Sequence, residues 1–260
     1  METVTTEEIL GHLTELRFKH WGVKLKDDLE QMNPKERDII LPHLSRWLVG
    51  EKTERRAAQI NAKIRGAKFR QLQTIDSYNF KYSKELEKIE RPYIEFYNSI
   101  KRDEPPSAVF TGNSGTGKTH LARSLGYSAC QKGMSVLFIT AAEMVNHLAH
   151  AQKISALEQE LNRYRKPQVL IIDELGYVSL DTQASNLFFQ VISARHDQKL
   201  GTIATTNIPF GKFNQIFAND AIAHAIVDRL VNEAEVFYME GPSYREHQRQ
   251  EKMKRRKKEA

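Results

Sequence analysis

The sequence predicts an α/β protein, with a parallel sheet flanked by helices, preceded by a small all-helical domain. Two observations lead to this prediction. From about residue 106 onward, apolar runs of strand length alternate with longer amphipathic stretches, which is typical of parallel strands joined by helical crossovers. Before residue 75, apolar residues recur at helical spacing. The chain has 260 residues, enough for a main domain with an appendage.

Three amphipathic segments predict helices within residues 1–75. The first follows an acidic turn at residues 6–8. The second covers residues 33–50, with Gly50 as its stop, and Pro42 inside it is expected to break or kink the helix. The third covers residues 53–72, and residues at helical spacing form its packing stripe: Ala57, Ile60, Ile64 and Ala67.

We predict that residues 76–105 form a linker region. An aromatic trio opens it, Tyr78, Phe80 and Tyr82, which we expect to pack against the next domain rather than to stack on bases. A short helix follows, and Pro92 should end it at or before Arg91, because the residue preceding a proline is pushed out of the helical region.

Residues 106–245 hold the predicted sheet. We expect strands at residues 108–111, 135–140, 169–172, 202–206 and 234–239. Helices are expected from residue 120, over residues 141–165 with a break near 153–155, and over residues 181–196.

A phosphate-binding loop pattern, G-x-x-x-x-G-K-[ST], follows the first strand. Its glycines let consecutive N–H groups turn around a phosphate, its lysine places a charge on the β and γ phosphates, and its threonine offers a hydroxyl to Mg²⁺. The strand before it and the helix after it disfavour a chance match. The predicted nucleotide contacts are Gly112, Asn113, Ser114, Gly115, Thr116, Gly117, Lys118 and Thr119.

Two adjacent acids end the third strand, whose aliphatic run suits a strand buried on both faces. Asp173, together with Thr119, is expected to support Mg²⁺, and Glu174 to orient and polarise the attacking water. This second acid favours hydrolysis over binding alone. Asn207, at the tip of the fourth strand, could sense the γ-phosphate or hold this water, and a role in a turn is about equally compatible with its position.

Composition disfavours several classes of protein. The longest apolar runs are strand-length, so a membrane span is not expected, and the N-terminus lacks the pattern of a secretion signal. Cys130 is the single cysteine and cannot form an internal disulfide. These features indicate a cytoplasmic protein.

Positive charge is concentrated in two segments of a chain with net charge +6. Residues 51–70 hold seven basic side chains against two acids, and residues 241–260 hold eight against three. Such clusters favour binding to a nucleic-acid backbone, although a solvated helix face and an inert tail stay open as alternatives. Arg56, Lys63 and Arg70 lie seven apart on the predicted third helix. The candidate DNA contacts are Arg55, Arg56, Lys63, Arg65, Lys68 and Arg70.

Several motifs together resemble the IstB family, the AAA+ helper ATPases of insertion-sequence transposition. They are the phosphate loop, the run at residues 172–177, and the segments at 187–192, 205–207, 225–230 and 241–245. The resemblance covers residues 54–245. These features also occur, with variation, in DnaC-type helicase loaders, which are the alternative.

The resemblance implies an AAA+ ATPase domain at residues 106–245 without a separate helical lid. It implies ATP at a subunit interface of a homo-oligomer, with Arg229 reaching the neighbour's site and Arg245 the γ-phosphate of its own. An ordinary surface ion pair is the alternative for each arginine. Residues 1–75 would bind double-stranded DNA, residues 246–260 would form a basic tail, and the partner would be a transposase. A plain nucleotide switch without a DNA role is a third hypothesis.

Overall fold

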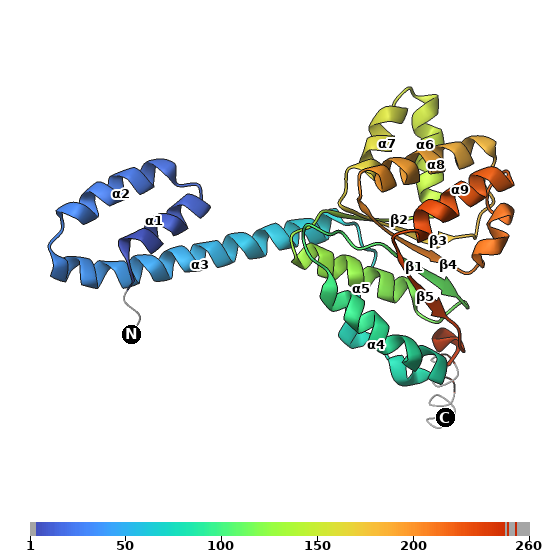
Figure 1. The fold of residues 1–260 in the computed structure, drawn as a ribbon, viewed down its shortest axis with the longest axis horizontal. Helices are drawn as coiled ribbons and strands as arrows, with labels where there is room; N and C mark the ends of the chain where they lie inside the picture. Colours follow the sequence, from blue (N-terminus) through green and yellow to red (C-terminus); the bar gives the residue numbers. More distant parts are fainter. Residues whose placement is uncertain (1–3, 248, 250–252, 254–260) are drawn as a thin grey trace. The chain divides into compact units, whose positions relative to one another are not determined.

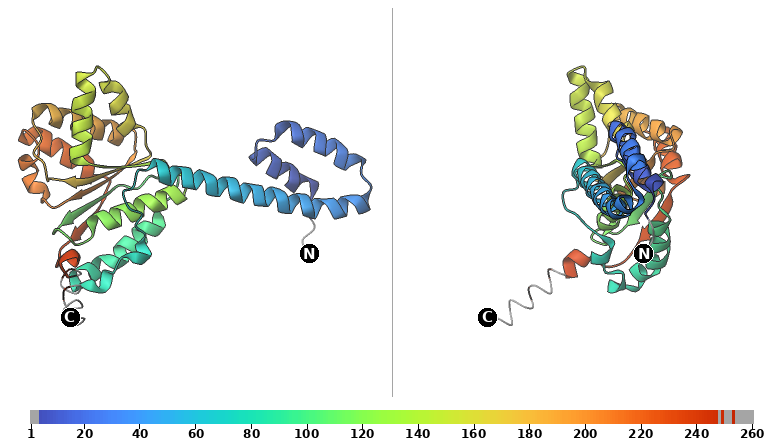
Figure 2. Two further views of the ribbon diagram at one scale, coloured as in Figure 1. Left: turned by 180° about the vertical axis from the view of Figure 1, so that it is seen from behind. Right: turned by 90° about the vertical axis from the view of Figure 1, so that its left-hand side faces the viewer.

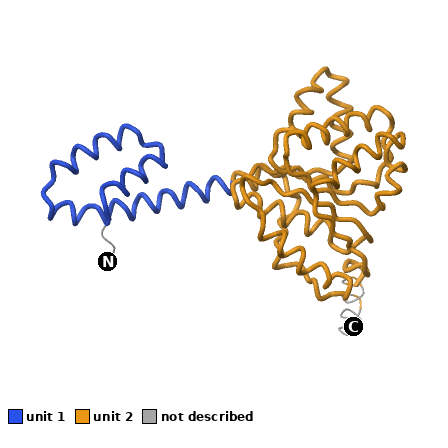
Figure 3. Tube along the Cα trace, viewed as in Figure 1, with its two compact units in different colours: residues 1–61 blue, residues 62–260 orange. Residues whose placement is uncertain are grey.

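The computed structural model describes residues 4–247, 249 and 253, and it divides the chain into two compact units. The first is Met1–Asn61 and the second Ala62–Ala260 (Figure 3). Most of the predicted basic tail lies outside the described residues.

The first unit is built from three helices: α1 (Thr6–Glu15), α2 (Lys19–Gln31) and the first part of α3 (Pro34–Gly66). Reciprocal hydrogen bonds between Thr5 and Glu8 cap the start of α1. Apolar side chains from all three helices form the core: Ile9, Leu13, Leu16, Leu29, Leu41 and Leu48. The helical nature of this region is confirmed, but α2 had not been predicted.

The predicted stop at Gly50 is wrong, and so is a break at Pro42, because α3 runs through both residues. Both residues are exposed. The carbonyl that Pro42 leaves without its helical partner belongs to Asp38, which is exposed too, so water can hydrate it. The predicted end at residue 72 is also wrong, since α3 ends at Gly66.

The second unit begins with the end of α3 and the linker. Ala67 is fully buried, and its carbonyl accepts a hydrogen bond of 2.8 Å from the Phe138 amide at the edge of the sheet. Two short 3-10 helices follow, Ile75–Ser77 and Phe80–Tyr82. The packing predicted for the aromatic trio is confirmed, since Phe80 is buried in a core cluster and Tyr78 and Tyr82 pack against it.

Helix α4 (Lys84–Ser99) passes through Pro92, so the predicted stop before this proline is wrong. Pro92 and the residue whose carbonyl it leaves free, Lys88, are both exposed. Hydration of that carbonyl lets the buried Leu86 and Tyr93 hold a single helix against the core.

Among the residues that the structure describes, five parallel strands form the sheet in the order β2-β3-β4-β1-β5 (Figure 1). They are β1 (Ala108–Gly112), β2 (Val136–Thr140), β3 (Val169–Leu175), β4 (Gly201–Thr206) and β5 (Glu235–Met239). The five predicted strands are confirmed, and β3 continues far enough to include both acids. The connecting helices are α5 (Lys118–Gln131), α6 (Ala141–Lys153), α7 (Leu157–Arg165), α8 (Thr182–Asp197) and α9 (Asp220–Val231), with a 3-10 helix at Phe210–Gln215.

Helices cover both faces of the sheet, with α4 and α5 on one face and α6 to α9 on the other (Figure 2). On β2 and β3, alternate residues enter the two cores, as the period of a strand requires. On β3, Val169 and Ile171 pack toward α5, and Leu170 and Ile172 pack toward α8. Within the described residues, no helix is long and apolar enough to cross a membrane.

Candidate nucleotide-binding site

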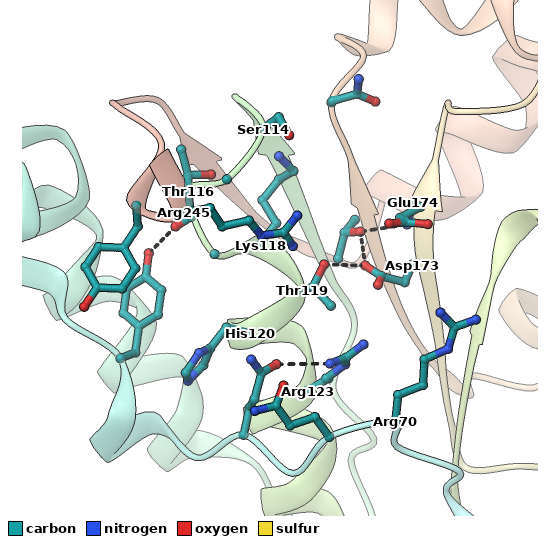
Figure 4. Close-up of a pocket in the computed structure, with 18 of the residues that line it drawn as sticks. Arg70, Ser114, Thr116, Lys118, Thr119, His120, Arg123, Asp173, Glu174 and Arg245 are labelled. Atoms are coloured by element: carbon teal, nitrogen blue, oxygen red, sulfur yellow. Dashed lines mark hydrogen bonds between the residues drawn. The ribbon is translucent and has the colours of Figure 1, made fainter. Parts of the chain in front are cut away.

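A cavity of about 800 Å³ lies at the carboxyl ends of β1, β3 and β4 (Figure 4). This is the edge at which open α/β sheets bind their ligands. Residues 114–119 of the phosphate loop contribute to its lining, as do Asp173, Glu174, Asn207 and Arg245, whereas Gly112 and Asn113 do not. The structure therefore brings together most of the residues that the sequence singled out.

The phosphate loop is held between two other segments of the chain. Gly115 and Gly117 have φ angles of +80° and +94°, in the left-handed region that favours glycine. A Cβ at Gly115 would collide with Ser243, and one at Gly117 with Tyr78. Tyr78 also donates a hydrogen bond of 2.7 Å from its hydroxyl to the Thr116 carbonyl. Both glycines are needed for the backbone path and for this close packing.

Lys118 lies folded onto the loop. Its Nζ donates to the carbonyls of Gly112, at 2.8 Å, and Asn113, at 2.6 Å. Burial lowers the pKa of Lys118 to about 8, Asp173 opposes this shift, and Arg245 adds to it. An anionic phosphate in the cavity would favour the charged form of Lys118 and raise this pKa again.

This lowered pKa predicts a pH-dependent affinity for ATP. Because only the charged ammonium attracts phosphate, affinity should be full below about pH 8 and should fall as pH rises beyond it, by at most about tenfold per pH unit. Titrating a fluorescent ATP analogue between pH 7 and pH 9.5 measures this. The weak residual affinity of Lys118→Met should not fall over the same range. A constant wild-type affinity up to pH 9.5 would contradict the prediction.

The two acids on β3 have different surroundings. Asp173 is 3% exposed, and its Oδ1 accepts hydrogen bonds from the hydroxyls of Thr119, at 2.8 Å, and Thr205, at 2.6 Å. Glu174 is exposed and lines the cavity. Thr119 and Asp173 thus bring together the oxygen ligands that Mg²⁺ prefers, while the Glu174 carboxylate is accessible to a water molecule.

Arg245 and Asn207 lie in the cavity, whereas Arg229 does not contribute to its lining. Arg229 lines a different, smaller cavity together with Pro105 and Ser107, which lead into β1. It therefore lies near the amino ends of the strands, whereas Lys118 lies at their carboxyl ends. Its Nε donates to the Ser193 hydroxyl at 3.2 Å. Its guanidinium also lies 5.0 Å from the centre of the Phe189 ring. Arg229 therefore faces away from the site of its own subunit.

The six candidate DNA contacts have varied surroundings. Arg55 pairs with Glu51 at 2.6 Å and lies over the ring of Phe18. Arg70 lies beyond α3, so the single helical face predicted for it is wrong. It pairs with Glu143 at 2.5 Å and lines the cavity. The remaining members, Arg56, Lys63, Arg65 and Lys68, have exposed or half-buried side chains.

Sequence reasoning missed several residues of the cavity. Tyr78 and Tyr82 were expected only to pack, yet both also line the cavity. The hydroxyl of Thr205 was not singled out, although its place at the end of a strand beside the acids was a usable signal. Arg123 follows Lys118 by five residues and donates to Gln73, 3.4 Å from Nη1 to Oε1.

Comparison with known proteins gives a family match over most of the chain. The model of the family described as IstB-like ATP binding protein matches residues 13–252. The ATP-binding protein of insertion sequence IS5376 from Geobacillus stearothermophilus is 37% identical over 202 residues, which cover 78% of this chain and 79% of the relative. The ATP-binding protein of insertion sequence IS232 from Bacillus thuringiensis subsp. berliner is 34% identical over 186 residues, or 72% of this chain and 73% of the relative.

Among solved structures, the DnaC helicase loader is similar with a TM-score of 0.56. It is 20% identical, and the match covers 64% of this chain and 96% of that chain. A likeness at this identity shows the fold alone, and it confirms the AAA+ phosphate-loop fold expected from the sequence. The described residues that follow Arg229 hold β5 and one short helical stretch, without a separate helical lid.

Proposed function

The chain belongs to the family of IstB-like ATP-binding proteins, and from this membership we propose that it is the ATP-hydrolysing, DNA-binding helper of an insertion-sequence transposase. The observation that carries the proposal is that residues 114–119 of the phosphate loop line one cavity together with Asp173 and Glu174. The names of its relatives, ATP-binding proteins of insertion sequences, support the transposase as partner.

In the proposed reaction, the loop N–H groups and Lys118 hold the phosphates of ATP. Thr119 and Asp173 would hold Mg²⁺, which neutralises phosphate charge when bound. Lys118 must first leave the carbonyls of Gly112 and Asn113, and the charge of the phosphates favours this exchange. Binding is therefore expected to release the loop carbonyls from the lysine.

Glu174 orients the water that attacks the γ-phosphate. Its carboxylate is exposed to the cavity, while the neighbouring Asp173 is held by two hydroxyls. Phosphoryl transfer depends mainly on positioning the reactants and on stabilising the developing charge. In this proposal Glu174 positions the water, and Asp173 helps to hold the metal ion that stabilises the charge. Arg245, in the same cavity, would contribute positive charge on the γ-phosphate.

Arg229 would complete the site of a neighbouring subunit. Arg229 lies near the amino ends of the strands, whereas Lys118 lies at their carboxyl ends. It can therefore contact a bound phosphate only when a second copy of the chain places its cavity beside Arg229. This position supports a homo-oligomer with ATP at subunit interfaces. Such an assembly would act in the cytoplasm, where ATP and the target DNA are found.

Duplex DNA would contact the basic segment at residues 51–70. Phosphate contacts of this kind position a protein without specifying sequence, so we expect weak sequence preference. A DnaC-type loader of a replicative helicase is the alternative, and the similarity to the DnaC structure supports it only at the level of the fold.

A double substitution tests the DNA contact. Arg56→Ala with Arg65→Ala removes two exposed charges of the basic segment, so DNA affinity should fall and the slope of log K against log salt should decrease by about two. Fluorescence anisotropy at several salt concentrations measures both. The matched control, Lys24→Ala with Lys26→Ala, removes two exposed charges from α2 and should change neither. If the two double substitutions lowered DNA affinity and the salt slope equally, the proposal that residues 51–70 contact DNA would be contradicted.

A further inference from the structure

One hydroxyl connects the two acids of the site. Thr205 lies on β4, next to β3, and is 2% exposed. We propose that Thr205 is a positioning residue for hydrolysis, which holds the Asp173 carboxylate and the Glu174 backbone in one fixed arrangement. The proposal rests on the proposed function and adds a residue to it.

Both contacts of the Thr205 hydroxyl can exist together. Its Oγ1 accepts from the Glu174 amide at 3.0 Å and donates to Asp173 Oδ1 at 2.6 Å. A hydroxyl has one donor and two acceptor positions, so neither bond excludes the other. Thr119 donates to the same carboxylate oxygen at 2.8 Å. Asp173 is therefore held from the phosphate loop and from β4 at once.

The backbone at Glu174 needs such an anchor. Between β3 and β4, Ile172 pairs with Ala204 and the next pair joins Leu175 to Thr206. Three steps along β3 thus match two along β4, so β3 carries one extra residue, a bulge. Glu174 has a φ angle of +61°, in the left-handed region that non-glycine residues seldom adopt. The Thr205 hydroxyl accepts the amide hydrogen within this irregular stretch.

This anchor has a chemical consequence. The direction of the Glu174 side chain depends on its backbone conformation, and strained conformations at active sites persist only when the surroundings hold them. Without the hydroxyl, Glu174 can relax away from the γ-phosphate, and a misplacement of about 1 Å is enough to slow a reaction about a hundredfold. The Thr205 hydroxyl forms its two hydrogen bonds with Asp173 and Glu174 rather than with the backbone of the phosphate loop, so nucleotide binding should survive.

The test compares three substitutions on β4. Thr205→Val keeps the shape and removes the hydroxyl, and we expect kcat for ATP to fall at least about tenfold while KM changes less than about threefold. Thr205→Ser restores the hydroxyl and should bring kcat back to within about threefold of wild type. The matched control is Thr202→Val, which removes another buried hydroxyl of β4, one that accepts from Arg195 Nε at 3.1 Å. It should lower the melting temperature and leave kcat unchanged.

A second readout does not depend on activity. In the nucleotide-free protein, exchange of the Glu174 amide hydrogen, followed by NMR, should accelerate at least about tenfold in Thr205→Val but not in Thr205→Ser or Thr202→Val. If the Glu174 amide of Thr205→Val stayed as protected from hydrogen exchange as in wild type, the proposed anchoring role of Thr205 would be wrong, whether or not the protein hydrolyses ATP.

The outcomes separate the two proposals. If Glu174→Gln abolishes hydrolysis while Thr205→Val hydrolyses ATP within twofold of wild type, the positioning role is wrong and the proposed function stands. If Thr202→Val slows hydrolysis as much as Thr205→Val, the effect is general destabilisation, and the positioning role is again overturned. If the wild-type protein hydrolyses no ATP with DNA present, the proposed function fails, and the catalytic role of Thr205 fails with it.

Discussion

Replacing Glu174 with glutamine is expected to lower kcat for ATP hydrolysis by about 10²–10⁴-fold, because the amide cannot accept a proton from the attacking water. ATP affinity should change less than about threefold, since in the proposed site the loop and Lys118 hold the phosphates and this side chain does not. Single-turnover hydrolysis and equilibrium binding of a fluorescent ATP analogue measure the two quantities separately.

The matched control is Glu143→Gln, the same substitution at another acid near the cavity. Glu143 caps α6 through Thr140, a task that a glutamine can also perform, and it pairs with Arg70. The rate of ATP hydrolysis by Glu143→Gln should stay within about threefold of wild type. If Glu143→Gln slowed hydrolysis as much as Glu174→Gln, the specific role of Glu174 would be wrong.

Arg229→Ala should lower kcat by about 10³–10⁵-fold, the range found for arginines that complete a phosphoryl-transfer site in trans. The reason is geometric, since Arg229 lies near the amino ends of the strands, away from Lys118, and in the proposed oligomer it would reach a neighbour's nucleotide. Steady-state ATP hydrolysis at protein concentrations that allow assembly measures the loss, and circular dichroism checks that the fold survives.

Mixing two inactive variants tests whether Arg229 acts in trans. Lys118→Ala lacks a functional nucleotide site and keeps its arginine, whereas Arg229→Ala keeps the site and lacks the arginine. Mixed oligomers contain interfaces that unite the two intact halves, so the mixture should hydrolyse ATP faster than the sum of its components. A mixture of Arg229→Ala with the chain that carries both Lys118→Ala and Arg229→Ala should show no increase in ATP hydrolysis over the sum of its components. Wild-type activity of Arg229→Ala alone would refute the role in trans.

Much of the second unit could be predicted because its signals are local. The aliphatic run at residues 169–172 suits a strand buried on both faces, and the structure places it at the inner position β3. The loop glycines likewise specify a backbone path that few sequences allow, and Gly115 and Gly117 adopt it. The break between α6 and α7 was visible in the same local way.

The errors arose where distant contacts outweigh local preferences. Pro42, Gly50 and Pro92 each disfavour a helix in an isolated peptide, but all three are exposed here, and buried leucines on the same helices preserve α3 and α4. Arg70 was placed on a helix by its spacing, and only the tertiary structure brings it to Glu143. The bridge that Thr205 makes between the two acids depends on the bulge in β3, which no spacing in the sequence reveals.

The central claim is tested most directly by sedimentation velocity. The wild-type protein and Glu174→Gln are compared in the presence of ATP, each with duplex DNA, with single-stranded DNA and without DNA. We predict large ATP-dependent assemblies on duplex DNA, which dissociate as wild type hydrolyses ATP and persist in Glu174→Gln. Assembly on single strands alone would favour a helicase loader. If neither protein responded to DNA, the account of an ATP-dependent DNA-binding helper would be contradicted.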